Sequence, residues 1–407
     1  MHLSQSDANR FMNILHIATS DGGGAGLAAC RLHQGLRDIG VESRVLCREQ
    51  ERDAVGVERY AIAPWKYKLM MAWRFRSVLG KARRILRDPA PDYEQYSFPF
   101  SACDVENHPL VQWADVVHLH WVAHFVNYPA FFKRVRKPLV WTLHDMNPFL
   151  GGFHYAGDEA WHPWPIDQRM KRIKRDALKH ARGLTVVSPS RWLDACADGS
   201  GVFQGRPRRV IPNGIDTAEF KPRPRDAARE RFGIPPDKKT LLFVAMPGHG
   251  ACLRKGTDLL EEGLPRFASM DLHVCGIGSF KNKAIHGIPR VNNAAELAAL
   301  YSAADFFILP SREDNLPNTM LEAMACGTPV VGTPVGGMLD FIRDGETGVL
   351  AREVSAGALC EAVRRAVEDC AFDREKIRAF AEARFSLEKQ ARAYCGVYRE
   401  ALGMRDE

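Results

Sequence analysis

The chain has 407 residues, of which 46% are hydrophobic and 26% charged, with 33 glycines and 24 prolines. These proportions are close to those of ordinary globular domains, so they exclude a collagen-like, coiled-coil or wholly disordered protein. At roughly 150 residues per domain, the length predicts two or three domains. The 56 basic and 49 acidic residues leave a net charge of +7.

Several features of the sequence report on the cellular compartment. No stretch approaches the roughly 18 consecutive apolar residues of a membrane-spanning helix, and the polar residues 1–11 contain no apolar core of a secretory signal. The ten cysteines form no Cys-x-x-Cys pair and no Cys/His cluster with the spacing of zinc ligands. We therefore expect a cytoplasmic protein whose cysteines are reduced structural thiols.

The positive charge is concentrated in residues 61–90, which hold eight Lys and Arg residues and a single acidic residue. On a helix, the apolar and basic side chains of this segment fall on different faces. The pattern predicts a basic amphipathic helix over 66–87 on an anionic membrane surface, with Trp65 and Trp73 as interfacial anchors. A surface helix packed on its own domain is the alternative, and nucleic acid is not favoured because no recognition motif accompanies the charge. The side chains expected to contact the membrane are Lys66, Lys68, Arg74, Arg76, Lys81, Arg83, Arg84 and Arg87.

The first half of the chain alternates short apolar strands with helices, which predicts a parallel α/β sheet. His118 and His120 lie on one of the expected strands and are interpreted as structural. The expected strands are 14–18, 43–47, 116–120, 139–143 and 183–187, and the expected helices are 27–39 and 167–182.

The alternation restarts after a Pro- and charge-rich stretch at 221–239, which marks a second domain. The fold class is therefore α/β, with two Rossmann-like domains whose parallel sheets face a central cleft, because ligands of open α/β sheets bind outside the carboxyl ends of the strands. Strands are expected at 241–245, 272–275, 306–309 and 329–331, and helices at 256–262, 295–303, 317–326 and 355–371. The expected parts are a flexible extension at 1–12, a first domain at 13–210, a second domain at 211–373, and C-terminal helices at 374–407 that close onto the first domain.

A glycine-rich loop, residues 19–26, joins the first expected strand to the first helix. From Gly24 onward the loop satisfies the permissive G-x-G-x-x-G/A pattern of dinucleotide-binding folds. Five residues, 19–23, separate this pattern from the strand, whereas the first Gly of the dinucleotide pattern follows the strand directly. A longer loop that presents backbone N–H groups and a helix N-terminus to a phosphate or hydroxyl is favoured. A nicotinamide-dependent dehydrogenase and a turn without a ligand remain the alternatives.

The most informative stretch is 310–331. A strand ends at Leu309, a polar loop follows, and Pro317 lies near the first turn of the next helix. Such a loop directs backbone N–H groups and the helix dipole toward an anion, while Asp314 and Glu322 offer carboxylates to sugar hydroxyls. The stretch therefore predicts a sugar-nucleotide site.

Over most of its length, the sequence resembles the retaining glycosyltransferases of family 4, which have the two-domain GT-B fold. The opening Gly-Gly-Ala-Gly loop and the stretch 142–149 are similar to the branch of this family that builds bacterial surface polysaccharides. Three further motifs carry the resemblance. In the first, Asp314 and Glu322 are separated by seven residues, and Ala-Met-Ala-Cys-Gly-Thr-Pro-Val-Val follows the Glu. The second is Arg254-Lys255-Gly256, and the third is the stretch 210–216.

The resemblance implies a role for each matching residue, and it makes Asp314, Glu322, His144 and Lys255 the expected catalytic residues. Glu322 would bind the ribose hydroxyls, and Asp314 would contact the transferred sugar near its anomeric carbon. Lys255 would neutralise the diphosphate of the donor, and His144 would touch the sugar. The backbone of six further residues would approach the donor: Gly23, Gly24, Asn315, Leu316, Pro317 and Asn318.

Two positions depart from the family pattern. Asp314 stands where the family usually has Glu, and its side chain is one methylene shorter. Met246 stands where the family often has Arg, so Arg254 is expected to supply that charge and to bind the donor. These departures leave a non-catalytic relative that binds nucleotide or carbohydrate as an alternative.

No Asp-x-Asp pair, the usual ligand set for a metal-bound diphosphate, occurs in the sequence. We therefore expect no metal and no other cofactor, with cations and the helix dipole stabilising the leaving group. The resemblance implies transfer of a sugar from a nucleotide-sugar to a hydroxyl of a glycan or polyprenyl-linked oligosaccharide in polysaccharide biosynthesis, without a protein nucleophile. A glucan synthase with a soluble acceptor is the alternative within enzymes.

Overall fold

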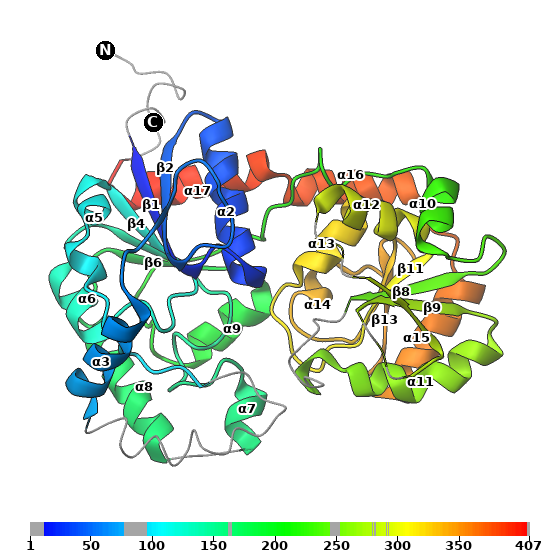
Figure 1. The fold of residues 1–407 in the computed structure, drawn as a ribbon, viewed down its shortest axis with the longest axis horizontal. Coiled ribbons are helices and arrows are strands. Elements are labelled where there is room, and N and C mark those ends of the chain that lie inside the picture. Colours follow the sequence, from blue (N-terminus) through cyan, green and yellow to red (C-terminus); the bar gives the residue numbers. More distant parts are fainter. Residues whose placement is uncertain are drawn as a thin grey trace. The chain divides into compact units, whose positions relative to one another are not determined.

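A computed structural model of the protein describes residues 12–76, 96–161, 165–244, 253–278, 280, 282–289, 291 and 293–404. The chain divides into two compact units, each built on an open sheet with helices on both faces (Figure 1). The first unit holds the described residues of 12–214 together with 387–404, and the second unit holds those of 215–386.

The first unit contains a seven-stranded parallel sheet in the order β3-β2-β1-β4-β5-β6-β7. The side chains of β4, β5 and β6 are buried throughout, because helices cover both faces, and this explains their nearly continuous apolar runs. The strands are β1 (Asn13–Ser20), β2 (Glu42–Glu49), β3 (Val57–Arg59), β4 (Val116–Leu119), β5 (Leu139–Thr142), β6 (Leu184–Ser188) and β7 (Arg208–Val210).

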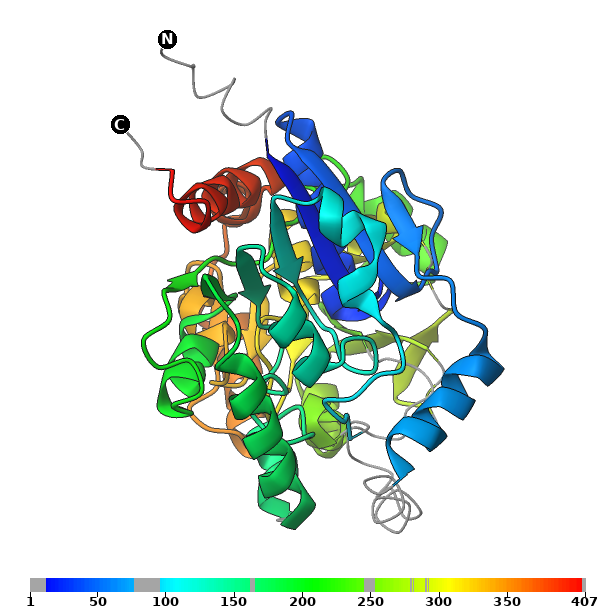
Figure 2. The same ribbon diagram turned by 90° about the vertical axis from the view of Figure 1, so that its left-hand side faces the viewer.

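Helices cover the first sheet on two sides. Large aromatic side chains, among them Phe131 and Trp141, fill the core on one side. On the other side α17 (Leu387–Ala401) packs against α2 (Gly23–Asp38), where a Cβ at Gly35 would lie 2.8 Å from the Leu387 carbonyl oxygen, so only glycine allows the close approach (Figure 2). The remaining helices are α3 (Pro64–Arg74), α5 (Pro109–Trp113), α6 (Tyr128–Arg134), α7 (Ala156–Trp161), α8 (Pro165–Leu178), α9 (Arg191–Gly199) and the 3-10 helix η1 (Val105–Asn107).

The second unit contains a six-stranded parallel sheet in the order β10-β9-β8-β11-β12-β13. Two separate apolar clusters are packed around this sheet, as expected for a sheet covered on both faces. The strands are β8 (Thr240–Val244), β9 (His273–Ile277), β10 (Ile285–Ile288), β11 (Phe306–Leu309), β12 (Val330–Gly332) and β13 (Gly348–Leu350). The helices are α10 (Arg225–Phe232), the 3-10 helix η2 (Leu253–Lys255), α11 (Thr257–Ser269), α12 (Ala294–Ala303), α13 (Asn318–Ala325), α14 (Met338–Phe341), α15 (Ala356–Glu368) and α16 (Arg374–Phe385).

Both sheets have the strand order of a Rossmann fold. The order reverses between β1 and β4 in the first sheet and between β8 and β11 in the second. Ligands of such sheets bind at this switch point, outside the carboxyl ends of the strands. The expected α/β class with two Rossmann-like domains is confirmed.

The division of the chain differs from the expected one at two places. The second unit begins at Ile215 rather than at 211, and α16 belongs to it, because Ile377, Ala381 and Phe385 are buried in its core. Only α17 joins the first unit, so the expectation that all of 374–407 closes onto the first domain is wrong for α16. Of the expected extension 1–12, residues 1–11 lie outside the described residues, and Met12 is buried in the core.

The glycine-rich loop is shorter than the sequence suggested. Strand β1 continues to Ser20 and α2 already begins at Gly23, so only two residues lie between them, rather than the eight residues 19–26 expected from the sequence. The glycines therefore form the first turn of the helix. A Cβ at Gly26 would overlap the Ser20 carbonyl oxygen, so glycine is needed where the helix lies close to the end of the strand.

The basic helix predicted over 66–87 is not continuous. Helix α3 ends at Arg74, and Phe75, which stacks on Phe100, leaves the helical conformation with φ −119° and ψ 21°. Arg74 pairs with Asp104 at 3.1 Å, and Lys66, Lys68 and Arg76 are exposed. The predicted contacts Lys81, Arg83, Arg84 and Arg87 lie outside the described residues. No helix in the described ranges combines the length and the apolar composition needed to cross a bilayer.

Candidate functional site

In the second unit, the loop after β11 places one buried carboxylate between two cations. The Lys255 Nζ donates to Asp314 Oδ2 at 2.5 Å, and Arg254 Nη1 lies 3.8 Å from Asp314 Oδ1. The Asn315 backbone N–H also donates to Oδ1, at 3.0 Å. Burial alone would raise the pKa of Asp314, but Lys255 and Arg254 hold this pKa below its ordinary value, so the carboxylate is charged at neutral pH.

Two glycines make this loop geometry possible. Gly256 has φ +66°, and a Cβ at this position would overlap the Pro310 carbonyl oxygen. Gly336 has φ +56°, and a Cβ there would overlap the Asp314 carbonyl oxygen. The left-handed backbone and the close approach both favour glycine, and together they bring Arg254 and Lys255 onto the acidic loop.

Helix α13 follows the acidic loop and carries Glu322. Pro317 is the N-cap residue of α13 and provides no side-chain hydrogen bond, and the preceding Asn315 and Leu316 are buried. Glu322 is 5% exposed, and its Oε2 accepts a hydrogen bond from the Tyr301 hydroxyl at 3.0 Å. Tyr301 was not predicted, because it comes from α12 and no local motif marks it. The predicted residue Asn318 begins α13 and is half-buried, whereas Met246 lies outside the described residues.

In the first unit, the predicted donor residues Gly23 and Gly24 lie exposed in the first turn of α2. No side chain caps this helix of 16 residues at Gly22. The preceding turn is fixed by Asp21, whose carboxylate accepts from the backbone N–H groups of Glu51, at 2.6 Å, and Arg52, at 3.0 Å. The positive end of a helix dipole is thus presented on a fixed turn, which suits an anionic ligand.

His144, the other residue predicted in this unit, ends a chain of three imidazoles. Its Nε2 lies 3.0 Å from His120 Nδ1, and His120 Nε2 lies 2.9 Å from His16 Nδ1. Burial lowers the pKa of His144 to about 4, and burial together with neighbouring imidazoles lowers the pKa of His120 and His16 well below the ordinary value. The three rings are therefore neutral at physiological pH.

The buried end of this chain fixes the tautomer of every member. His16 Nε2 is buried and has no hydrogen-bond partner among the described residues. A buried N–H without a partner is rarer and more costly than an unused lone pair, so the hydrogen of His16 lies on Nδ1 and is donated to His120 Nε2. His120 must then donate from Nδ1 to His144 Nε2. His144 is left with its hydrogen on Nδ1 and acts as a neutral hydrogen-bond donor.

His118 holds the C-terminal helix rather than the imidazole chain. Its Nδ1 lies 2.7 Å from the Tyr398 hydroxyl and its Nε2 lies 2.7 Å from Thr142 Oγ1, which in turn bonds the Tyr394 hydroxyl. This agrees with the structural interpretation of His118, whereas His120 is the direct partner of His144. His16, His118 and His120 could offer metal ligand atoms within 4.8 Å of one another, but both nitrogens of His118 and of His120 are already hydrogen-bonded.

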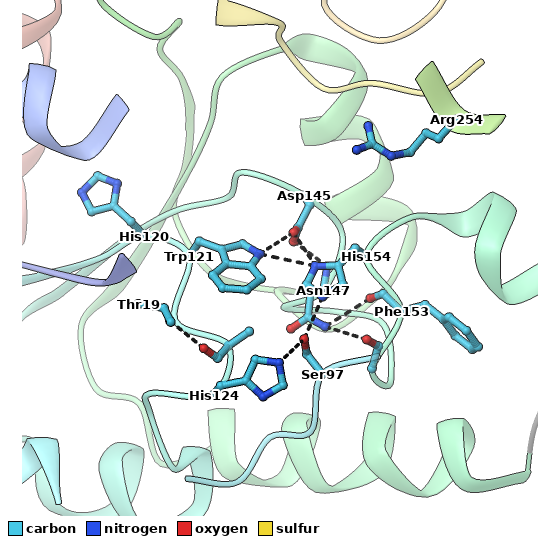
Figure 3. A network of polar contacts seen from close by, with 12 residues as sticks. Thr19, Ser97, His120, Trp121, His124, Asp145, Asn147, Phe153, His154 and Arg254 are labelled. Atoms are coloured by element: carbon cyan, nitrogen blue, oxygen red, sulfur yellow. Dashed lines mark hydrogen bonds and ion pairs between the residues drawn. The ribbon is translucent and has the colours of Figure 1, made fainter. Parts of the chain in front are cut away.

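The loop that follows His144 is held by a second polar network (Figure 3). Asp145 Oδ2 accepts from Trp121 Nε1 at 2.8 Å and pairs with His154 Nδ1 at 2.6 Å. His154 Nε2 accepts from the Ser97 hydroxyl at 2.8 Å. Burial would raise the pKa of Asp145, but His154 and the other donors keep this pKa below its ordinary value. Ser97, His154 and Asp145 have the bonding order of a hydrolase triad, but all three are buried, so they fix the loop instead.

Lys174 of α8 also holds this loop, through Asn147. Its Nζ donates to the Asn147 backbone oxygen at 2.5 Å and to Asn147 Oδ1 at 3.1 Å. Burial lowers the pKa of Lys174 to about 7, against the opposing effect of Asp145 and Asp167. These contacts were not predicted, because they join α8 to a loop about 27 residues earlier in the chain and depend on the packing of the helix.

Comparison with known protein families identifies two glycosyltransferase models that match this chain. The family described as Glycosyltransferase Family 4 matches residues 22–219, and the family described as Glycosyl transferases group 1 matches residues 238–369. The chain belongs to the family 4 glycosyltransferases. The resemblance inferred from the sequence is confirmed, and the protein is a transferase enzyme.

Relatives and solved structures cover nearly the whole chain. A D-inositol 3-phosphate glycosyltransferase from Acidothermus cellulolyticus is 27% identical over 95% of this chain and 87% of its own length. Sucrose-phosphate synthase from Thermosynechococcus elongatus has a TM-score of 0.68 at 18% identity, over 97% of this chain and 100% of its own. Anabaena HepE in complex with UDP-glucose has a TM-score of 0.64 at 18% identity, over 96% of this chain and 100% of its own. The likeness shows that this family 4 glycosyltransferase has the GT-B fold.

Proposed function

We propose that this family 4 enzyme is a retaining glycosyltransferase that moves a sugar from a nucleotide-sugar donor to a hydroxyl of a glycan or lipid-linked oligosaccharide in polysaccharide biosynthesis. The observation that carries the proposal is the contact of Lys255 and Arg254 with the buried Asp314, directly before α13. One loop thereby combines cations and helix amides, which suit a diphosphate, with a carboxylate, which suits sugar hydroxyls. The relatives named for D-inositol 3-phosphate and the HepE complex with UDP-glucose support an acceptor hydroxyl and a nucleotide-sugar donor.

The cations would act on the leaving group. As the bond between the anomeric carbon and the diphosphate breaks, negative charge collects on the diphosphate oxygens. Lys255 and Arg254 are already positioned by their contacts with Asp314, so they stabilise this charge without reorganising. No metal is required in this proposal, because the two cations and the amides at the start of α13 supply the positive field.

The carboxylates and the imidazole would orient the substrates. Asp314, charged at neutral pH, accepts from hydroxyls of the transferred sugar near its anomeric carbon, and Glu322 accepts from the ribose hydroxyls of the donor. His144, the neutral ring at the end of the imidazole chain, touches the transferred sugar. The acceptor hydroxyl attacks the face from which the diphosphate departs and passes its proton to the departing phosphate. Sugar configuration is retained without a protein nucleophile.

Donor turnover in the absence of metal tests this proposal. Purified protein is incubated with UDP-, GDP- and ADP-sugars in EDTA, and slow donor hydrolysis is followed for wild type, Glu322→Ala and the exposed control Glu262→Ala of the same unit. Turnover of one donor that is retained in Glu262→Ala and lost in Glu322→Ala is the expected result. Nucleotide binding without turnover would favour the non-catalytic relative, and elongation of a soluble glucan without any lipid would favour the glucan synthase.

We also propose that the enzyme is cytoplasmic and that α3 holds its first unit on the inner face of the membrane. Trp65, Leu69 and Trp73 are spaced four residues apart, share one face of α3, and are 70%, 63% and 79% exposed. Lys66 and Lys68 lie on the same helix and are exposed. Aromatic side chains beside lysines suit the headgroup region of an anionic leaflet.

Vesicle flotation tests the membrane proposal. We expect wild type to float with phosphatidylglycerol vesicles and not with phosphatidylcholine vesicles, and Trp65→Ser/Trp73→Ser to lose this binding. The control Leu339→Ser removes a different exposed apolar side chain, 52% exposed, from the second unit and is expected to bind as wild type does. Absence of wild-type flotation at low salt would refute the proposal.

A further inference from the structure

In the second unit, a buried tyrosine lies behind the carboxylate that is proposed to bind the ribose of the donor. The Tyr301 hydroxyl donates to Glu322 Oε2 at 3.0 Å, and the two residues are 1% and 5% exposed. Tyr301 comes from α12 and Glu322 from α13, and these two helices pack against each other (Figure 1). The orientation of a carboxylate that contacts the donor therefore depends on a residue of another helix.

Side chains from outside the helix fix the end of α12 that carries Tyr301. The last backbone oxygens of a helix have no partner within it, and here those of residues 301–304 are all held. Thr328 Oγ1 donates to the Tyr301 oxygen at 2.7 Å. Arg374 donates to the oxygens of residues 302 and 304, at 3.3 Å and 2.9 Å, and Arg229 Nε donates to that of residue 303 at 3.0 Å.

The ring of Tyr301 is fixed as well. It packs edge to face on Phe307, with the ring centroids 5.3 Å apart and the planes at 86°. Since both the backbone and the ring are held, the phenol oxygen has a defined position. A hydrogen bond from such a donor sets the orientation of the carboxylate that accepts it.

A phenol acts on a carboxylate differently from a cation. Asp314, in the loop before α13, is held by Lys255 and Arg254, whose charges attract it. The Tyr301 hydroxyl is a neutral donor, so it directs Oε2 of Glu322 without neutralising the charge of the carboxylate. An ionised carboxylate accepts about four hydrogen bonds, so one hydroxyl of the protein and two hydroxyls of a sugar can bind it together.

We propose that Tyr301 is a positioning residue that holds the Glu322 carboxylate in the orientation in which it accepts from both ribose hydroxyls, so that the site selects ribonucleotides over deoxyribonucleotides. This inference rests on the proposed function, in which Glu322 accepts from the ribose hydroxyls of the donor. The last torsion of a Glu side chain is broad, so without the Tyr301 hydrogen bond the carboxylate rotates and one of the two sugar hydroxyls loses its acceptor. The loss falls on recognition of the ribose and not on the diphosphate, which the cations of the loop would bind.

Calorimetric titration of the full-length protein with UDP, GDP and ADP, each compared with its 2′,3′-dideoxy form, tests the proposal. A hydrogen bond to a charged group is worth about tenfold to a hundredfold in affinity, so we expect wild type to bind one of these nucleotides at least about tenfold more tightly than its dideoxy form. Tyr301→Phe keeps the ring and should lower this ratio at least about threefold, while the affinity for the dideoxy form changes less than about twofold. The control Tyr394→Phe removes a buried phenol hydroxyl of the first unit, which bonds Thr142 Oγ1, and should leave the ratio as in wild type.

Glu322→Gln separates a failure of this inference from a failure of the proposed function. This variant should also lower the ratio, and Tyr301→Phe should add little in the Glu322→Gln background, because both changes act through one carboxylate. A ratio that falls in Glu322→Gln but not in Tyr301→Phe would overturn the positioning role and leave the ribose contact of Glu322 standing. If wild type does not distinguish the two forms, or if neither variant lowers the ratio, the ribose contact itself is refuted.

Two further outcomes keep the test decisive. Equal losses of affinity for the two forms in Tyr301→Phe would assign Tyr301 a structural role only and overturn the proposal. Thr328→Val removes the hydroxyl that holds the Tyr301 oxygen but keeps the phenol. If Tyr301→Phe does not fold, a lowered ratio in Thr328→Val supports the proposal and an unchanged ratio overturns it.

Discussion

The contact between Lys255 and Asp314 makes a strong prediction for Lys255→Gln. At 2.5 Å and an effective dielectric constant of about 20, the Coulomb attraction is about 7 kcal/mol. The Lys255 side chain is 42% exposed, however, so water screens most of this attraction. We therefore expect the variant to lose about 1–3 kcal/mol of the free energy of unfolding at pH 7, because Asp314 keeps its hydrogen bond from Asn315 but loses the nearer of its two cations.

The effect of pH on this loss follows from the sign of the Asp314 pKa shift. The folded-state pKa of Asp314 lies below its ordinary value, so the pair stabilises the protein above the unfolded pKa of about 3.9 and loses this effect as the pH falls through the folded pKa. In Lys255→Gln the Asp314 pKa rises, so the variant protonates this carboxylate at a higher pH. The difference in stability between the two proteins should therefore shrink as the pH falls below about 4.

Urea denaturation at low salt and donor turnover measure the two consequences of the substitution. A double-mutant cycle with Asp314→Asn isolates the pair, and we expect Lys255→Gln to cost less than about 0.5 kcal/mol in the Asp314→Asn background. The kcat should fall about 10²- to 10³-fold in Lys255→Gln, as for the loss of one preorganised donor to a developing charge. Lys255→Arg keeps the charge and should retain more activity. A coupling energy near zero, or an unchanged kcat, would refute the reasoning.

Three further predictions concern other parts of the molecule. In wild type, nitrogen-15 NMR should find the His144 hydrogen on Nδ1, and a hydrogen on Nε2 would contradict the assigned chain. His120→Phe should lose this single tautomer and reduce kcat about tenfold, and it should also lower Tm because the buried His16 N–H loses His120 as its partner. The pKa of Lys174 is about 7 in the folded protein and about 10.4 in the unfolded chain, so the stability of wild type relative to Lys174→Met should rise as the pH rises between these values. Parallel pH–stability curves of the two proteins would argue against a buried lysine. Gly256→Ala should cost several kcal/mol more than the control Gly345→Ala, because both have positive φ but only Gly256 faces a carbonyl; equal Tm shifts would contradict this.

The central strands could be predicted from the sequence because both of their faces are buried. The strand at Phe306–Leu309 is found where its apolar run predicted it, since four consecutive buried side chains leave a clear signal. The edge strands β3 and β7 were missed, because each is three residues long, partly exposed and rich in polar side chains. The start of α2 was misplaced because glycines, which usually mark loops, form its first turn.

The residues of the candidate site also divide into those that the sequence predicted and those that it did not. Arg254, Lys255 and Asp314 could be expected together because each belongs to a motif, and the structure brings them into contact. The partners Tyr301 and His120 carry no local signal. His16 and His118 lie side by side because β1 and β4 pair at that level, although the two residues are far apart in the sequence. Such contacts depend on strand register and helix packing, which no spacing along the chain determines.

The imidazole chain of the first unit and the Lys255–Asp314 pair of the second unit are stabilised in opposite ways, and this has a consequence for experiments at different ionic strengths. In the first unit, burial keeps the imidazoles of His16, His120 and His144 neutral, so their hydrogen bonds carry no net charge for salt to screen. In the second unit, Lys255 is partly exposed and its charge reaches solvent. Salt screens exposed charges strongly and neutral hydrogen bonds hardly at all. Binding steps that rest on Lys255 should therefore weaken as salt rises, while the orientation of His144 stays the same.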